Sequence, residues 1–232
     1  MAATRMPAGS WACIKQQIIA RRSPVHEEKI TFHDLSEYEN VDLQGFRGDI
    51  YVKEAIIPEG ASVIPKSQFF ECRSLEKVYL PESVSGIEDY AFADCHVLKV
   101  WESIEKLSLK SVGISAFENC YALEFVSLPD SLTVIGGAAF AECVSVNKLI
   151  FSDTSLLKKI GDHAFRGCRN LKEIYLPDSV EYVGVSAFRD CSSLEQISVS
   201  EKIKNQPGIA ELEKNCPNAR IRFREVNSVE KE

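Results

Sequence analysis

The chain has 232 residues, of which 45% are hydrophobic and 26% charged, a balance typical of a folded globular protein. Its formal net charge of −7 argues against nucleic acid as the main partner, because an acidic surface repels a phosphate backbone. No run approaches the ~18–20 apolar residues of a membrane-spanning helix, so we expect no membrane span.

Residues 1–26 form a basic leader without a single acidic residue. Apolar side chains fall at roughly helical spacing at Trp11, Ile14, Ile18 and Ile19. Two interpretations stay open. The leader is an organelle-targeting segment or an arm for an acidic partner, or it is a short helix or loose segment beside the fold. It lacks the continuous apolar stretch of a secretory signal.

Residues 27–49 mix apolar side chains with many charges. A stack of repeats exposes an apolar end unless something covers it. We therefore expect residues 27–49 to be an N-terminal cap.

Residues 50–216 repeat a short unit that ends in a cysteine. The steps between successive cysteines alternate between 23 and 25 residues, and a period in this range indicates stacked supersecondary units. The cysteines that define the register are Cys72, Cys95, Cys120, Cys143, Cys168, Cys191 and Cys216.

Each unit carries the same apolar frame. A phenylalanine stands three residues before the cysteine in six units, and an aliphatic residue stands eight before it. After the cysteine, apolar residues at the third, sixth and, in most units, eighth positions alternate as in a short strand with one buried face. One unit is too small to bury this face, so stacking must build ladders of like residues, with strands about 4.8 Å apart. Glycines such as Gly113 and Gly136 suit a positive φ or a close approach between coils.

The best copies of the unit are residues 73–95, 121–143 and 169–191. Their pattern, Leu-x-x-Ile-x-Leu-Pro-x-x-Val-x-x-Ile-Gly-x-x-Ala-Phe-x-x-Cys, resembles the repeat of the BspA-like leucine-rich repeat family. The resemblance implies a leucine-rich-repeat solenoid, α/β-type and β-rich. Its chain would form a right-handed superhelix of about seven coils, with one parallel sheet and short helical or irregular turns opposite.

The alternating steps define a larger repeat, which is a pair of coils that together span 48 residues. The shorter coil contains Leu-Pro, and the longer coil lacks it and holds two extra residues. The insertions lie near 101–103, 152–154 and 200–202, and they should stack along one edge. That edge is a binding rim, or it consists of solvated turns.

Seven of the eight cysteines occupy one repeat position, where a small, easily buried side chain is wanted. We therefore expect free, buried thiols, although stacked cysteines could also come within disulfide range. The chain has no Cys-x-x-Cys motif and no histidine spaced to complete a zinc site, so we expect no metal and no cofactor.

Residues 217–232 should form a C-terminal cap strand and tail. The final coil has Glu213 in place of the phenylalanine, as expected of a more polar terminal repeat. Arg220, Ile221, Arg222, Phe223 and Arg224 alternate as in an edge strand, whose charges discourage end-to-end aggregation.

The fifth and seventh residues after each cysteine should point out of the core. Aromatic side chains at these positions in alternate coils would form a row about 10 Å apart, a reasonable protein-binding surface. Aromatic residues also have high β-propensity and pack on one another across a sheet, and this alternative stays open. The candidate protein-binding residues on the sheet and its adjoining turns are Tyr79, Trp101, Phe125, Ile150 and Tyr175.

Enzymatic chemistry finds little support, since the four histidines share no repeat position and a filled solenoid offers no evident pocket. We expect a non-catalytic protein–protein interaction scaffold, an intracellular module or a subunit of a larger assembly. The alternative is a surface or secreted adhesin-like protein. The expected location is the cytoplasm or a large assembly, with an organelle or the cell surface as alternatives.

Overall fold

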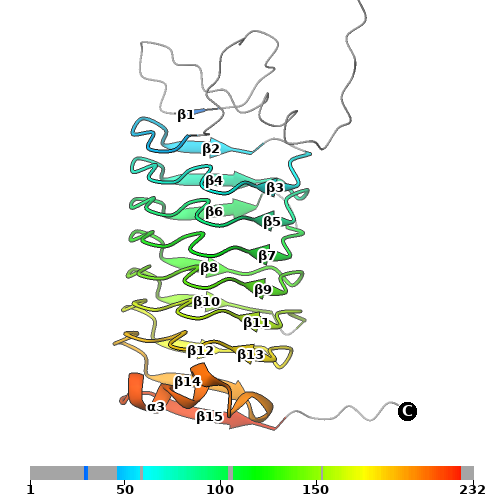
Figure 1. The fold of residues 1–232 in the computed structure, drawn as a ribbon, viewed down its shortest axis with the longest axis vertical. Helices are drawn as coiled ribbons and strands as arrows, with labels where there is room; N and C mark the ends of the chain where they lie inside the picture. The colour runs from blue at the N-terminus through cyan, green and yellow to red at the C-terminus, as the bar shows by residue number, and fades with distance from the viewer. Residues whose placement is uncertain (1–28, 31–45, 58–59, 104–106, 153, 226–232) are drawn as a thin grey trace, which may run out of the picture.

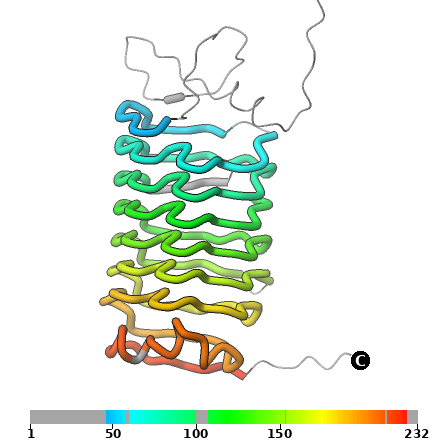
Figure 2. Tube along the Cα trace, in the orientation of Figure 1, coloured from blue at the N-terminus to red at the C-terminus, as the bar shows by residue number. Residues whose placement is uncertain are grey.

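The computed structural model describes residues 29–30, 46–57, 60–103, 107–152 and 154–225, and for residues 29–30, 100–103 and Glu213 it describes the backbone alone. The chain winds into coils stacked along the long axis of the molecule (Figures 1 and 2). The leader and most of the N-terminal cap lie outside the described residues, and the domain boundaries at residues 26, 49 and 216 stay predictions.

Each coil contributes one short strand to a main parallel sheet, because its apolar residues alternate with polar ones. In β8 (Phe125–Ser127), for example, Val126 is buried while its two neighbours are exposed. All pairings between these strands are parallel, and Figure 1 shows the strands stacked in chain order. The other strands are β1 (Lys29–Ile30), β2 (Glu54–Ile56), β4 (Lys77–Leu80), β6 (Val100–Ser103), β10 (Lys148–Ile150), β12 (Glu173–Tyr175), β14 (Gln196–Ser200) and β15 (Arg220–Arg224).

The main sheet consists of three hydrogen-bonded groups, β1-β2-β4-β6, β8-β10 and β12-β14-β15. The divisions follow β6 and β10, which belong to the longer coils. The strand of each Leu-Pro coil is therefore in register with that of the longer coil after it, as expected for a 48-residue pair.

A second, narrower sheet runs beside the main one, in addition to the single sheet that the sequence predicted. Its six strands each have two residues and pair in chain order. They are β3 (Val63–Ile64), β5 (Gly86–Ile87), β7 (Ser111–Val112), β9 (Val134–Ile135), β11 (Lys159–Ile160) and β13 (Tyr182–Val183).

Glycines follow several of these strands because the coils approach closely there. A Cβ on Gly136 would lie 2.6 Å from the carbonyl carbon of Gly113. Of the two explanations that the sequence allowed, close approach is therefore the correct one, and a positive φ is not needed at these positions.

The third side of each coil is a turn. Two of its residues have a left-handed backbone conformation, one standing five residues before the cysteine and the other directly before it. Ser67 and Glu71 have φ of 55° and 60°, and Tyr90 and Asp94 repeat the pattern one coil later. Such a conformation costs on the order of 1–3 kcal/mol for a residue other than glycine. Hydrogen bonds between coils oppose this cost: the amide of Ser67 donates to Asp89 O at 3.0 Å and that of Glu71 to Ala93 O at 2.8 Å.

The core is one continuous cluster along the stack. Its centre is a ladder of nearly parallel phenylalanine rings with centroids 5.1–5.4 Å apart. Among the described residues, the first ring of the ladder is Phe46, inside the segment assigned to the N-terminal cap, and the ladder continues through Phe69, Phe92, Phe117, Phe140, Phe165 and Phe188. The solenoid of about seven coils is thus confirmed.

The last coil departs from the others. Its residues form η1 (Glu201–Ile203), α2 (Pro207–Ala210) and α3 (Leu212–Asn215) before the chain enters β15. Ile209 and Leu212 bury apolar surface there, 2% and 1% exposed. β15 pairs with β14 in parallel register over five residues, so the strand that alternation predicted at the end of the repeats is present.

Candidate binding surface

The outward face of the main sheet carries large apolar side chains that the fold leaves in contact with solvent. Phe125, Ile150 and Tyr175 are 52%, 41% and 51% exposed, and Tyr79 is half-buried. Each of these four residues is next to a buried residue of its own strand. Because side chains alternate between the two faces of a strand, these four lie on the outward face of the sheet. Four of the five predicted binding residues therefore lie on one face.

The register divides this face into two columns. Phe125 pairs with Lys148, whereas Ser127 pairs with Ile150. Tyr79, Ile150 and Tyr175 share the column seven residues after the cysteine, and Phe125 lies in the column two residues earlier, about 7 Å away along the strand. The prediction of a single aromatic row is wrong for this reason, because Phe125 occupies the other outward position of its coil.

Trp101 stands at a different kind of position. Its Cα is in register with that of Val78, a buried residue, while Glu102 is in register with Tyr79. The side chain of Trp101 lies outside the described residues, so its binding role stays a prediction.

Tyr175 is held by a residue that the sequence did not indicate. The guanidinium of Arg224 lies over its ring, 3.8 Å from the centroid. Nη2 of Arg224 also donates to Leu176 O at 2.6 Å and to Asp178 Oδ1 at 2.8 Å, and Nη1 donates to Ser198 Oγ at 3.0 Å. The side chain of Arg224 in β15 thus reaches across β14 and contacts Tyr175 in β12.

The sequence contained only a weak signal for this contact. Alternation places Arg220, Arg222 and Arg224 on the same outward face, but it does not show which of them folds back. The contact joins residues 46–48 apart in the chain, and only the register of β12, β14 and β15 brings them together.

Two of the three insertions are tied to the preceding coil. Thr154 Oγ1 donates to Asp130 Oδ2 at 2.5 Å, and Ser152 Oγ donates to the same carboxylate. In the next long coil, Lys202 Nζ donates to the carbonyl of Asp178. These contacts favour the interpretation of the insertions as braced, solvated turns, and a binding rim stays a prediction.

The cysteine ladder is a structural element of the core. Seven cysteines are free and buried, as predicted. Each thiol donates to the carbonyl of the phenylalanine one coil earlier, for example Cys95 to Phe69 O at 3.0 Å and Cys143 to Phe117 O at 3.1 Å.

Burial raises the pKa of every thiol in the ladder. The pKa of Cys72 rises to about 12 and that of Cys216, at the C-terminal end, to about 11. A thiol that stays protonated near neutral pH is a poor nucleophile and a poor metal ligand. Within the described ranges, no group of three or more His, Cys, Asp or Glu side chains could hold a metal ion.

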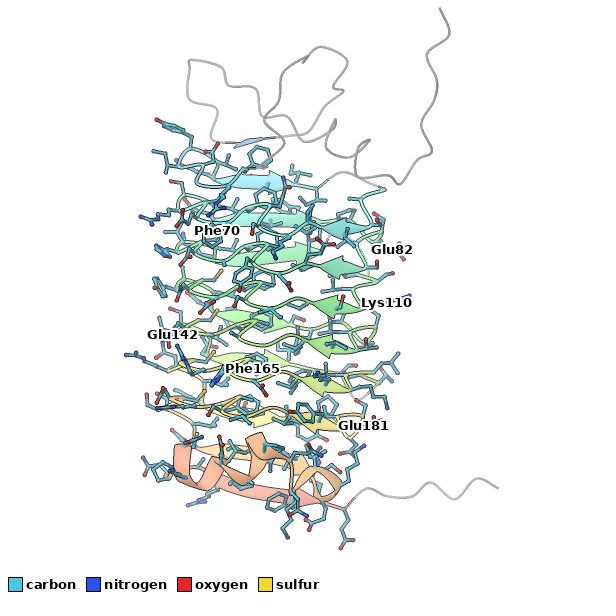
Figure 3. All side chains as sticks on the ribbon, in the orientation of Figure 1. Phe70, Glu82, Lys110, Glu142, Phe165 and Glu181 are labelled. Carbon is cyan, nitrogen blue, oxygen red and sulfur yellow. The ribbon has the colours of Figure 1, made fainter. Side chains whose placement is uncertain are left out.

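The other two sides of each coil carry ion pairs as well as exposed apolar residues such as Ile114, Leu156 and Val185. Figure 3 labels Glu142 on the turn side, Lys110 and Glu181 beside the second sheet, and Phe165 within the stack. Glu142 accepts from Arg166 Nη2 at 3.2 Å, and Lys158 pairs with Glu181 at 2.7 Å. In the part of the chain that is described, no helix is long and apolar enough to cross a membrane.

Stacked parallel coils with a ladder of buried leucine, phenylalanine and cysteine define a leucine-rich-repeat solenoid. The family model described as "BspA type Leucine rich repeat region" matches residues 39–154 and 110–216 with six copies. The chain belongs to this family, whose repeats generally serve protein–protein interaction.

Several solved bacterial structures are similar to this chain. The pneumococcal vaccine antigen PcpA is 27% identical over 65% of this chain, with a TM-score of 0.58, and this chain spans 41% of its length. A T. pallidum leucine-rich repeat protein is 26% identical over 66% of this chain and 67% of its own, with a TM-score of 0.44. A leucine-rich cell surface protein of Faecalibacterium prausnitzii is 23% identical over 79% and 62%, with a TM-score of 0.46. No curated protein matches the chain.

Proposed function

We propose that this protein is a non-catalytic scaffold that binds another protein through the outward face of its main sheet. The observation that carries the proposal is the exposure of Phe125, Ile150 and Tyr175 on neighbouring strands of one open face. Large side chains of this kind supply most of the energy of protein interfaces when a partner removes them from water.

The neighbouring charges suit the rim of such an interface. Lys148 and Glu173 are exposed in the column beside Ile150 and Tyr175. Charged rims steer encounter and set specificity more than they add affinity. The partner is therefore expected to present an apolar patch bordered by charges of both signs.

Arg224 also favours binding at Tyr175. The guanidinium stacks on the ring and donates to Ser198 of β14 and to Leu176 and Asp178, which follow β12. The aromatic side chain is therefore ordered before a partner arrives. An ordered anchor loses less conformational freedom on binding than a free one.

The test is partner capture by a triple variant, Phe125→Ala, Ile150→Ala and Tyr175→Ala. We expect capture to be lost while the thermal transition is retained. The matched control replaces three equally exposed apolar residues off this face, Ile114, Leu156 and Val185, which are 50%, 55% and 41% exposed. Equal loss in both variants, or capture by the first, would contradict the proposal.

We further propose that the protein works inside the cell, as a module or a subunit of a larger assembly. The support is the thiol ladder, since each hydrogen bond to a phenylalanine carbonyl requires a reduced cysteine. The similarity to a pneumococcal vaccine antigen favours the second candidate, a surface or secreted adhesin-like protein. Cell fractionation with thiol labelling of the denatured native protein separates them, because the first predicts an intracellular fraction with reduced ladder cysteines.

A further inference from the structure

The main sheet ends at β15 in an edge that has a neighbour on one side only among the described strands. β14 pairs with it over Arg220–Arg224, and the sheet order places β15 last in its group. Figure 1 shows no described element beyond it.

The register shows which backbone groups this edge presents. The amide of Arg220 donates to Glu195 O at 2.7 Å, so Arg220, Arg222 and Arg224 direct their backbone groups toward β14. Alternation directs the N–H and C=O groups of Ile221 and Phe223 to the outer edge. Their side chains pack against the core but stay partly exposed.

The edge is also rigid and basic. Arg224 ties it to β12 through Leu176 O and Asp178, while Arg220 and Arg222 are exposed on the outward face. Lys204 lies over the ring of Phe223, 5.2 Å from its centroid. Charges on an edge strand repel a second edge of the same sign, and they attract one of opposite sign.

We propose that β15 accepts an extended acidic segment of a partner protein as an additional strand of the main sheet. A strand added there would complete the backbone hydrogen bonds of Ile221 and Phe223, the mode of recognition known as β-augmentation. Its outward residues would stand beside Arg220 and Arg222, and its inward residues beside Ile221 and Phe223. The ligand is thus a segment in which acidic and apolar residues alternate.

This surface is independent of the proposed binding face on the earlier strands. The test uses the full chain and the blocked peptide Ser-Glu-Val-Glu-Val-Glu-Ser, with binding followed by fluorescence anisotropy. We expect saturable binding that the double variant R220E/R222E weakens roughly tenfold or more, because two favourable cross-strand pairs become repulsive. The peptide in which lysine replaces glutamate should bind that variant better than the unchanged protein.

Two controls separate strand addition from general attraction. The double variant K110E/K172E reverses the same charge on exposed residues of earlier coils and should bind the peptide unchanged. A peptide with N-methylated backbone amides keeps its charges, loses its donors and should not bind. Absence of binding, equal weakening by K110E/K172E, or undiminished binding of the methylated peptide would overturn the proposal. So would self-association of the protein through the same arginines, which would make a second copy the occupant.

Discussion

The inner ladder and the outward sheet face belong to the same strands, yet they follow opposite rules. Inside, every coil from Cys72 onward repeats a thiol that donates to a phenylalanine carbonyl, and six of those coils also bury a phenylalanine. Outside, the corresponding positions change from Lys77 to Phe125 to Glu173. The positions that repeat carry stability, and the positions that vary are the ones we propose for recognition.

The largest expected effect concerns the thiols and pH. Their pKa values lie above the ordinary value of 9.0 in the folded protein, so the unfolded chain loses these protons first as pH rises. The stability is fully present below about pH 9 and falls by roughly 1.4 kcal/mol per thiol per pH unit above it, until the folded thiols also ionise. Urea unfolding at pH 8 and pH 10 checks this, and Cys143→Ala should reduce the slope. A pH-independent midpoint over this range would contradict the buried ladder.

The next effect is Phe140→Ala, which removes a fully buried ring from the middle of the stack. A core truncation of this kind costs about 3–5 kcal/mol of unfolding free energy. The same change at Phe46 should cost less, because its ring is 9% exposed and loses less buried surface. Chemical denaturation measures both, and equal losses would argue against continuous packing.

Gly136→Ala probes the close approach of the coils. The added Cβ would lie 2.6 Å from backbone carbon, and overpacking of this kind costs about 1–3 kcal/mol. The adjacent Gly137 is a matched control, because a Cβ there would meet Asp162 O at 3.4 Å. We expect the melting temperature to fall for the first variant and to change little for the second.

Arg224→Ala gives the smallest of these effects. It removes one cation–π contact and the hydrogen bonds to Leu176, Asp178 and Ser198, a loss of about 1–2 kcal/mol. Arg222→Ala, on the same strand but exposed, should stay within about 0.5 kcal/mol. Thermal unfolding compares the two, and indistinguishable variants would show that the fold-back contact adds no stability.

The periodic part of the fold could be predicted from the sequence, because each buried position recurs with its residue type. The residue type of Phe140 recurs in five other units and that of Cys143 in six, so their buried surroundings could be predicted. The second sheet was missed since two-residue strands such as Val134–Ile135 give no alternation to detect. Phe46 was missed as a member of the ladder because Asp49 stands where the cysteine should be.

The candidate surface was predictable only in part. Period-two alternation identified Phe125, Ile150 and Tyr175 as outward, and their exposure agrees. The division into two columns follows from counting positions after the cysteine, but the Arg224 contact requires a side-chain conformation that no pattern encodes. Aperiodic contacts of this kind are specified by three-dimensional neighbours and not by the repeat.

Site-specific photo-crosslinking in cells tests the proposed binding role of the outward sheet face most directly. A photoreactive phenylalanine analogue would replace Phe125 in one protein and the equally exposed Ile114, off the sheet face, in another. The account predicts a discrete adduct with a partner protein from position 125 and none from position 114. Adducts from 114 alone, or from both positions alike, would contradict it.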